Sequence, residues 1–337
     1  MQASHLDPHM SILQSQGPEL VGAVALLQHA DPAERARFTA LEDAVWSSTT
    51  LRPAVIESVR LRCAHLRRCE SCSAMRISAG TEDGLTESQI PLLDKPAARD
   101  ELTPGQMAAL TLVDRFFQNP RAPEEAESTR IAEALGSRGI LEVLITCAVF
   151  CSSELRSALG EDGAPEGNVI VERPYGTVEE QDSATRWPAL ETSLLDPEGR
   201  FPNASPELTE PVHDLVRTLW SGAGCLSPDV AAACVVRSTQ LFGIGSDEPV
   251  IALLVPAIAA DLANGDDVRN WTHWPAGLRR DVLELAETLW LDPSQVNETV
   301  TDPLTAAIGV EGVILATWEL LWIKQLHRLT LVLHRGR

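Results

Sequence analysis

Two cysteines at a spacing suited to redox chemistry stand out in this sequence: Cys69 and Cys72 form a C-x-x-C pair. Two thiols at this spacing can close a small disulfide when the second lies on the first turn of a helix. The N-terminus of a helix also stabilises the thiolate, which is the reactive form of cysteine. Arg67, Arg68 and Arg76 add positive charge nearby in an otherwise acidic chain. The segment therefore predicts a reactive dithiol.

A carboxylic acid, Glu57, stands twelve residues before the first of these cysteines. It falls in the middle of an expected helix, with Val55, Ile56 and Val59 around it. A carboxylic acid among apolar side chains has a raised pKa and can accept a proton near neutral pH. We therefore expect Glu57 to take part in proton transfer near the cysteines.

The C-x-x-C pair has two other interpretations. A structural zinc site needs four ligands, and the sequence contains no second C-x-x-C. The donors in this region that could converge on zinc are Cys63, His65, Cys69 and Cys72. The other alternative is a structural pair of buried thiols. Redox chemistry is the leading hypothesis, and we expect no bound metal and no cofactor.

Helices must position these residues, because apolar side chains recur at helical spacing through most of the chain. Only the segment NVIVE at residues 168–172 looks extended, and it falls in an expected loop. The expected helices of the first half span residues 18–29, 38–48, 53–68, 103–118, 123–135 and 138–159. The sequence therefore predicts an all-α fold.

The sequence also resembles itself. Residues 304–333 align with residues 131–160 without a gap, which places Gly309 on Gly136. Other matched positions are Gly312 on Gly139, Trp220 on Trp46, Pro228 on Pro53 and Arg237 on Arg62. We therefore expect two helical halves of common ancestry. The alternative is that amphipathic helices align through their shared period alone.

The second half does not repeat the chemistry. At the positions of Glu57, Cys69 and Cys72 it has Ala232, Ile244 and Asp247. Cys225 and Cys234 are isolated, and we expect them to be small buried apolar residues. Cys147 and Cys151 are also expected in the core, the alternative being a second thiol pair near the site. The second half is therefore predicted to be a scaffold that takes the place of a second protomer.

Composition limits the domain organisation. The chain has 337 residues, of which 44% are hydrophobic, enough for about two domains. Gly, Pro, Asp, Glu and Ser are dense between residues 160 and 210, which indicates a long connection. We expect an N-terminal tail at 1–17, a helical domain with the C-x-x-C at 18–165, a linker at 166–208 and a second helical domain at 209–337. Trp318 and Trp322 form either an interface stripe or part of the core.

Charge and hydropathy indicate which partners and which cellular location to expect for the chain. The formal net charge is −21, which argues against nucleic acid or an anionic membrane as the main partner. The longest apolar run, residues 250–260, is much shorter than the ~20 residues that span a bilayer. No targeting segment is visible. We therefore expect a cytoplasmic protein that binds neither nucleic acid nor membrane.

The spacing of Glu57, Cys69 and Cys72 resembles the signature of the AhpD-like alkylhydroperoxidases of the carboxymuconolactone decarboxylase superfamily. In that signature a Glu is followed after eleven residues by C-x-x-C and, three residues later, by His. This chain has Arg76 at the last position. The resemblance is specific over residues 57–72 and extends to the second half only through the repeat. It implies two tandem AhpD-like bundles that assemble into a homo-oligomer, a dimer or a trimer.

The resemblance also implies roles for individual residues. Cys72 would attack a hydroperoxide, Cys69 would resolve the product as a disulfide, and Glu57 would belong to the proton relay. Arg76 cannot complete that relay, because a guanidinium does not give up its proton, but it can lower the pKa of the thiol. His65 is a substitute base, the alternative being a histidine on the surface or lining the core.

Three functions follow as hypotheses. The leading one is an antioxidant peroxidase or disulfide oxidoreductase that uses a small hydroperoxide and a dithiol reductant. The second is a non-peroxidase enzyme acting on a small organic substrate, as in the decarboxylase branch of the superfamily. The third is a non-catalytic redox-sensing protein.

Overall fold

The computed structural model describes most of the chain between Asp31 and His334. The described residues are 31–151, 153–159, 168–173, 175–176, 185–188, 190, 192–201, 204–244, 248, 250–263 and 268–334. The tail expected at 1–17, the helix expected at 18–29 and Asp247 lie outside this set.

Helices account for 71% of the structure and strands for 3%, which confirms the expected all-α class. The first half contains α2 (Pro32–Ser47), α3 (Pro53–Leu66), α4 (Glu70–Ala74), α5 (Ser78–Glu82), α6 (Pro104–Gln118), α7 (Glu125–Phe150) and α8 (Ser153–Ala158). The second half contains α9 (Pro206–Ser221), α10 (Pro228–Leu241), α11 (Ile251–Leu254), α12 (Ala257–Leu262), α13 (Leu278–Leu291) and α14 (Glu298–Leu333). Short 3₁₀ turns lie at Ile90–Leu92, Pro96–Glu101, Val268–His273 and Pro293–Gln295.

Local sequence signals explain where several of these helices begin. The Asp31 side chain accepts a hydrogen bond from the N–H of Ala33 at the start of α2. Thr103 and Gln106 form a reciprocal capping box at the start of α6. Pro53 occupies the first turn of α3, where its missing N–H leaves no hydrogen bond unmade. These signals satisfy backbone donors that would otherwise lack partners.

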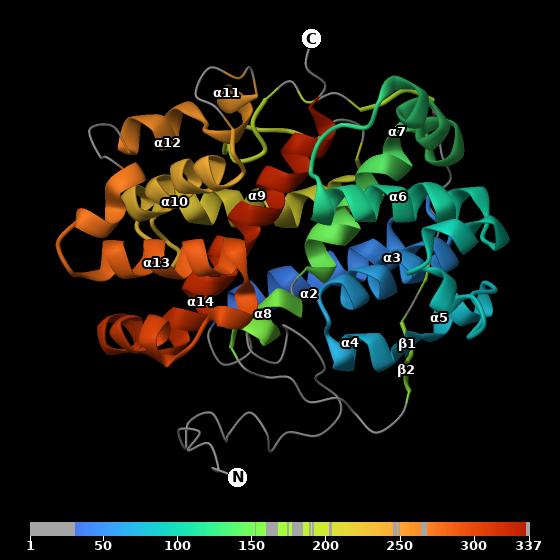
Figure 1. The fold of residues 1–337 in the computed structure, drawn as a ribbon, viewed down its shortest axis with the longest axis horizontal. Helices are drawn as coiled ribbons and strands as arrows, with labels where there is room; N and C mark the ends of the chain where they lie inside the picture. Colours follow the sequence, from blue (N-terminus) through green and yellow to red (C-terminus); the bar gives the residue numbers. More distant parts are fainter. Residues whose placement is uncertain are drawn as a thin grey trace.

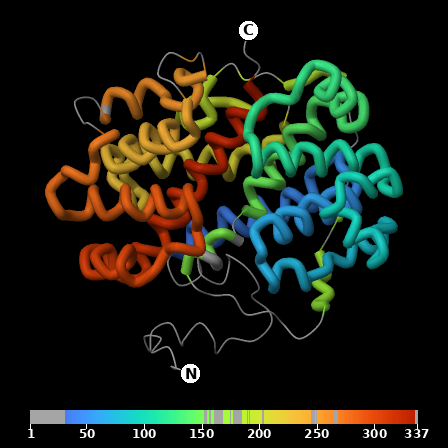
Figure 2. Tube along the Cα trace, viewed as in Figure 1, coloured from blue at the N-terminus to red at the C-terminus, as the bar shows by residue number. Residues whose placement is uncertain are grey.

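The helices form two groups with α14 between them (Figures 1 and 2). In Figure 1 the group from α3 to α7 lies to the right of α14 and the group from α10 to α13 to its left. α14 packs against α6, α7 and α8 on one side and against α10 and α13 on the other. Trp318 lies edge-on to Phe38 of α2, with ring centroids 4.9 Å apart, and also contacts Trp322. Both tryptophans therefore fill the core, which includes residues of both groups.

The long helices α7 and α14 share one unusual feature, a glycine kink in the middle. Gly136 has φ 68° and ψ 169°, and Gly309 has φ 74° and ψ 169°. This conformation is essentially confined to glycine. The non-helical residue Gly136 thus separates the two helical parts of α7 where the sequence predicts a boundary between helices at 123–135 and 138–159, and the short α8 follows. The glycine pair aligned in the sequence has the same conformation in both halves.

Helices α3 and α10 end in the same turn. Arg68 and Gly243, at matching positions, both have a left-handed backbone, with φ 54° and 69°. The next residues, Cys69 and Ile244, each donate their N–H to the carbonyl five residues earlier, at 3.0 and 3.2 Å. The turn that presents the first cysteine therefore recurs in the half that has no cysteine there.

A matching ion pair also occurs in each half. Arg62 of α3 lies 2.7 Å from the carboxylate of Asp114 in α6. Arg237 of α10 lies 2.9 Å from the carboxylate of Glu287 in α13. The similarity of the halves thus extends from sequence to backbone conformation and ion pairing.

The described part of the expected linker packs against the helices. Strand β2 (Val169–Val171) pairs in parallel with β1 (Met75–Ile77), which follows the C-x-x-C directly. Trp187, Leu194 and Leu195 are buried. The segment that looked extended in the sequence therefore lies beside the site.

Helix α14 is the one helix in the described part of the chain that is long and apolar enough to cross a membrane. Its most apolar window has a mean hydropathy of 1.6, and half of that window is buried inside the fold. From Val313 to Leu333 nearly every residue is buried. Within this fold α14 is the central core helix.

Candidate functional site

Cys69 and Cys72 are joined by a disulfide, with their Cα atoms 5.3 Å apart. Cys69 immediately precedes α4, and its sulfur accepts the N–H of Cys72 at 3.3 Å. Cys69 is buried, at 4% exposure, whereas Cys72 is partly exposed. Cys72 is therefore the more accessible residue of the pair.

The pair lies at one edge of the first group of helices, where α3, α4 and the β1–β2 pair meet (Figure 1). The turn after α3 reverses the chain into α4, and β1 then leads back to α5, which packs on α3. In the parallel pairing of β1 with β2, Met75 lies opposite Val169 and Ile77 lies opposite Val171. The cysteines thus lie between a helix on one side and a tethered strand on the other.

Glu57 forms an ion pair at this site. Both carboxylate oxygens accept hydrogen bonds from Arg60, each at 2.7 Å, and Oε1 also accepts the N–H of Ile77 at 3.1 Å. Glu57 is only 1% exposed. The carboxylate therefore does not lie among apolar side chains alone, because Arg60 neutralises it.

Arg60 is a site residue that the sequence reasoning missed. Its guanidinium donates to the carbonyl of Cys72 at 2.8 Å and to the carbonyl of Met75 at 2.6 Å. The signal was present, because residues three apart on a helix lie on one face and Glu57 and Arg60 have this spacing. Arg60 links α3 to the backbone of the reactive cysteine.

Gly80 lets α5 approach this ion pair closely. A Cβ at this position would lie 2.5 Å from the Cβ of Glu57. Any larger residue would push α5 away from α3 or displace the Glu57 side chain. The glycine therefore helps to bury the Glu57–Arg60 pair.

Arg76, at the position of the family histidine, binds Glu87 and the backbone next to Cys72. Its Nε lies 2.8 Å from the carboxylate of Glu87, and its Nη1 donates to the carbonyl of Ser73 at 2.6 Å. The guanidinium therefore binds the last turn of α4 and an exposed acid.

His65, the expected substitute base, forms an ion pair elsewhere. Its Nδ1 lies 2.8 Å from Asp94, whose carboxylate also binds Arg62 at 2.6 Å. Asp114 and Arg99 extend the same group of charges. The histidine therefore belongs to a cluster of ion pairs that joins α3 to α6.

The three arginines near the cysteines in sequence do not converge on them. Arg67 binds Glu154, Arg76 binds Glu87, and Arg68 is exposed. The expected local excess of positive charge around the disulfide is therefore dispersed.

Arg67 belongs to a buried charge network between the halves. Glu154 of α8 binds Arg67, Lys324 at 2.7 Å and Arg328 at 3.4 Å. Burial alone would raise the pKa of Glu154, but the three cations lower it to about 2. Burial lowers the pKa of Lys324 to about 7. The sequence reasoning identified neither Glu154 nor Lys324, because their contact joins distant segments.

Three further thiols of the first half lie in the core. Cys63, Cys147 and Cys151 are fully buried, and the Cys147 thiol is hydrogen-bonded to Cys63. Burial raises the pKa of Cys147 and of Cys151 well above its usual value. The thiols of Cys147 and Cys151 are therefore held in their unreactive protonated form.

The other donors considered for zinc have separate partners. Cys63 faces Cys147, His65 faces Asp94, and Cys69 is bonded to Cys72. Across the described residues, no group of three or more His, Cys, Asp or Glu side chains is placed to hold a metal ion.

The cysteines of the second half differ in exposure. Cys234 is fully buried, as expected. Cys225 is instead partly exposed, and its thiol donates to the carbonyl of Gly312 at 3.1 Å. Burial still raises the pKa of Cys225 to about 11. Both are thus poor nucleophiles at neutral pH.

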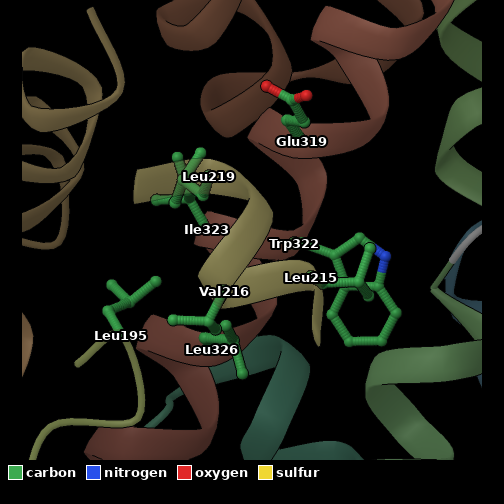
Figure 3. Close-up of a pocket in the computed structure, with 8 residues that line it drawn as sticks. All are labelled: Leu195, Leu215, Val216, Leu219, Glu319, Trp322, Ile323 and Leu326. Atoms are coloured by element: carbon green, nitrogen blue, oxygen red, sulfur yellow. The ribbon is translucent and has the colours of Figure 1, made fainter. Parts of the chain in front are cut away.

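An apolar cavity lies away from the disulfide, between α9 and α14 (Figure 3). It has an empty volume of about 280 Å³ and is lined by Leu195, Leu215, Val216, Leu219, Glu319, Trp322, Ile323 and Leu326. Glu319 borders it at one end and accepts the N–H groups of Cys225 and Leu226. Burial raises the pKa of Glu319 to about 7. None of the residues predicted for the site lines this cavity.

No protein-family model, curated protein or solved structure matches the chain. Any assignment of chemistry therefore rests on the residues of the site and on their geometry.

Proposed function

We propose that the chain is a disulfide oxidoreductase that reduces hydroperoxides through Cys69 and Cys72. The observation that carries the proposal is the disulfide itself, which joins a partly exposed cysteine to a buried one. A buried partner protects the resolving thiol from side reactions, while the outer thiol remains open to substrate. The other thiols considered above lack this combination.

The reaction balances with a hydroperoxide and a dithiol. The Cys72 thiolate attacks the outer peroxide oxygen, which breaks the O–O bond and gives a sulfenic acid and an alkoxide that takes up a proton to become an alcohol. The Cys69 thiol then attacks the sulfenic sulfur, which forms the disulfide and releases water. A dithiol reduces the disulfide by exchange and becomes oxidised itself. The net products are an alcohol, water and an oxidised dithiol.

The proton of the Cys72 thiol passes to solvent in this proposal. Glu57, His65 and Arg76 each contact a charged side chain other than Cys72, namely Arg60, Asp94 and Glu87. Cys72 is partly exposed, so water has access to it. This arrangement differs from the relay that the resemblance implied.

We further propose that the scaffold consists of two tandem AhpD-like bundles, the second without the dithiol. The shared helix order, the kinks at Gly136 and Gly309 and the turns at Arg68 and Gly243 support this. The proposal includes homo-oligomerisation as a dimer or trimer, a cytoplasmic location, and no binding to nucleic acid or membrane.

Peroxide consumption tests the proposed function. With a dithiol reductant, the natural chain should consume a small alkyl hydroperoxide steadily, and Cys72→Ser should abolish turnover. Cys69→Ser should slow turnover, because the sulfenic acid then has no thiol within the chain beside it and depends on direct attack by the external dithiol. Cys225→Ser is the matched control, since it removes a partly exposed thiol of the second half. Unchanged turnover in Cys72→Ser would contradict the proposal.

A further inference from the structure

We infer that Glu57 and Arg60 form a positioning clamp that holds the backbone of Cys72 in place for disulfide formation. This inference rests on the proposed redox use of Cys69 and Cys72, and it gives Glu57 a role other than proton transfer. The clamp consists of one ion pair on α3 and three backbone groups on the segment that follows the disulfide.

The first part of the clamp orients Arg60. The carboxylate of Glu57 accepts two parallel hydrogen bonds from the guanidinium, both at 2.7 Å. This paired geometry fixes the plane of the guanidinium as well as its position. Both side chains are at most 5% exposed, so water does not compete for these bonds.

The second part of the clamp holds the chain after the cysteine. Arg60 donates to the carbonyls of Cys72 and Met75, at 2.8 and 2.6 Å, and Glu57 accepts the N–H of Ile77 at 3.1 Å. α4 has only five residues, too few for its last carbonyls to find partners within the helix. Arg60 supplies those partners from α3. The junction between α4 and β1 is thereby fixed at three backbone atoms.

Glu57 is poorly placed to act as a proton acceptor. Both oxygens are already used as acceptors. Its geometry therefore suits a structural role, in which it holds Arg60 and the backbone of Ile77 in place.

The second half supports the link between the clamp and the cysteines. Glu57 and Arg60 align with Ala232 and Val235, so both members of the pair are absent there. The turn at Gly243 and Ile244 nevertheless keeps its backbone hydrogen bonds. The clamp is therefore not required to build the turn, and it occurs only in the half that has the dithiol.

Fixing the backbone of Cys72 has a direct chemical consequence. In the reduced chain it keeps the Cys72 sulfur next to the Cys69 sulfur, so the entropy of bringing the two together is lost on folding rather than on disulfide formation. Loosening the clamp should therefore lower the equilibrium constant for the disulfide and leave the overall fold in place.

The equilibrium between dithiol and disulfide in a glutathione redox buffer tests this inference. The variants are Glu57→Gln, Arg60→Met and the double variant Glu57→Ala/Arg60→Val, which carries the residues of the second half. Each single variant should lower the equilibrium constant by about tenfold or more. The double variant should lower it no further than the weaker single variant, because the two residues act as one unit. Circular dichroism confirms that each variant is folded.

Arg237→Met is the matched control, because it removes a partly buried arginine ion pair from the second half, and it should leave the equilibrium unchanged. The inference is overturned if Glu57→Gln and Arg60→Met leave the equilibrium unchanged, or if their effects add in the double variant. Single-turnover oxidation by hydroperoxide separates the clamp from a proton relay: a clamp predicts similar slowing in both single variants, and a relay predicts slowing in Glu57→Gln only. The redox equilibrium requires no hydroperoxide, so failure of the clamp and failure of the proposed peroxidase activity are distinguishable.

Discussion

The two halves of the molecule share a backbone and differ in the polar residues placed on it. Helices α3 and α10 end in the same left-handed turn, at Arg68 and Gly243. After that turn the first half has Cys69 and the second has Ile244. The comparison teaches that this turn forms with or without a cysteine after it, whereas the Glu57–Arg60 pair occurs only in the half that has the dithiol.

A second difference makes the halves complementary. Glu154 of the first half aligns with His327, and Lys324 of the second half aligns with Cys151. Glu154 and Lys324 bind each other across the boundary between the halves. Opposite charges therefore lie where the two halves meet, and Arg67, next to the dithiol turn, joins the same network.

The largest expected effect concerns this network. Glu154→Ala leaves Arg67, Lys324 and Arg328 without their shared counter-ion, and we expect it to lower the free energy of unfolding by about 3–5 kcal/mol. Urea denaturation measures the change. The control is Glu87→Ala, which breaks the exposed ion pair with Arg76 and should cost less than about 1 kcal/mol. Equal effects of the two variants would show that the network does not join the halves.

The next prediction concerns the pH dependence of stability and two ionisable residues of α14, Glu319 and Lys324. Burial raises the pKa of Glu319 to about 7 and lowers that of Lys324 to about 7. Because the pKa of Glu319 is raised in the folded chain, the free energy of unfolding falls as pH rises from about 4.5 to 7. Because the pKa of Lys324 is lowered in the folded chain, the free energy of unfolding rises as pH rises from about 7 to 10.5. Together they predict a minimum of stability near neutral pH.

Urea denaturation at several pH values tests this minimum. Glu319→Gln should remove the fall below neutral pH, and Lys324→Met should remove the rise above it. Each change should amount to roughly 1–2 kcal/mol over two pH units. The matching first-half residues, Thr146 and Cys151, bear no charge at these pH values. A stability curve with the same shape in both variants and in the natural chain would contradict the assignment.

The smallest effect is expected at the shared turn. Arg68 has φ 54°, a conformation that is unfavourable for a residue with a Cβ by roughly 1–2 kcal/mol. Arg68→Gly, which introduces the residue of the second half, should therefore raise the free energy of unfolding by about 1 kcal/mol, and Gly243→Ala should lower it by a similar amount. Thermal unfolding of the pair measures both. A loss of stability in Arg68→Gly would mean that the arginine side chain makes a contact worth more than the backbone strain.

Helices were predictable from the sequence because their signals are local. Apolar periodicity and the caps at Asp31 and Thr103 act within a few residues, and α3 and α6 lie close to their expected ranges. The break at Gly136 was predictable as well, because the apolar helical spacing stops before it and resumes after it, and the backbone is non-helical at that residue. The pairing of β2 with β1 was missed, since it joins segments about ninety residues apart.

The site was predictable in its residue types and less so in its contacts. The C-x-x-C spacing indicated the disulfide. Proximity in sequence did not show which partners the long charged side chains have: Arg67 binds Glu154, Arg76 binds Glu87, and His65 contacts Asp94. Arg60 went unnoticed because its role depends on carbonyl groups that only the folded chain brings to it.

Oxidation of the fully reduced chain by one equivalent of hydroperoxide tests the central claim most directly. The chain has seven cysteines, of which five are free beside the disulfide. The account predicts that two thiols disappear for each hydroperoxide consumed, and that peptide mapping places the new bond between Cys69 and Cys72. It is contradicted if all seven thiols remain, or if the thiols that disappear map to other cysteines.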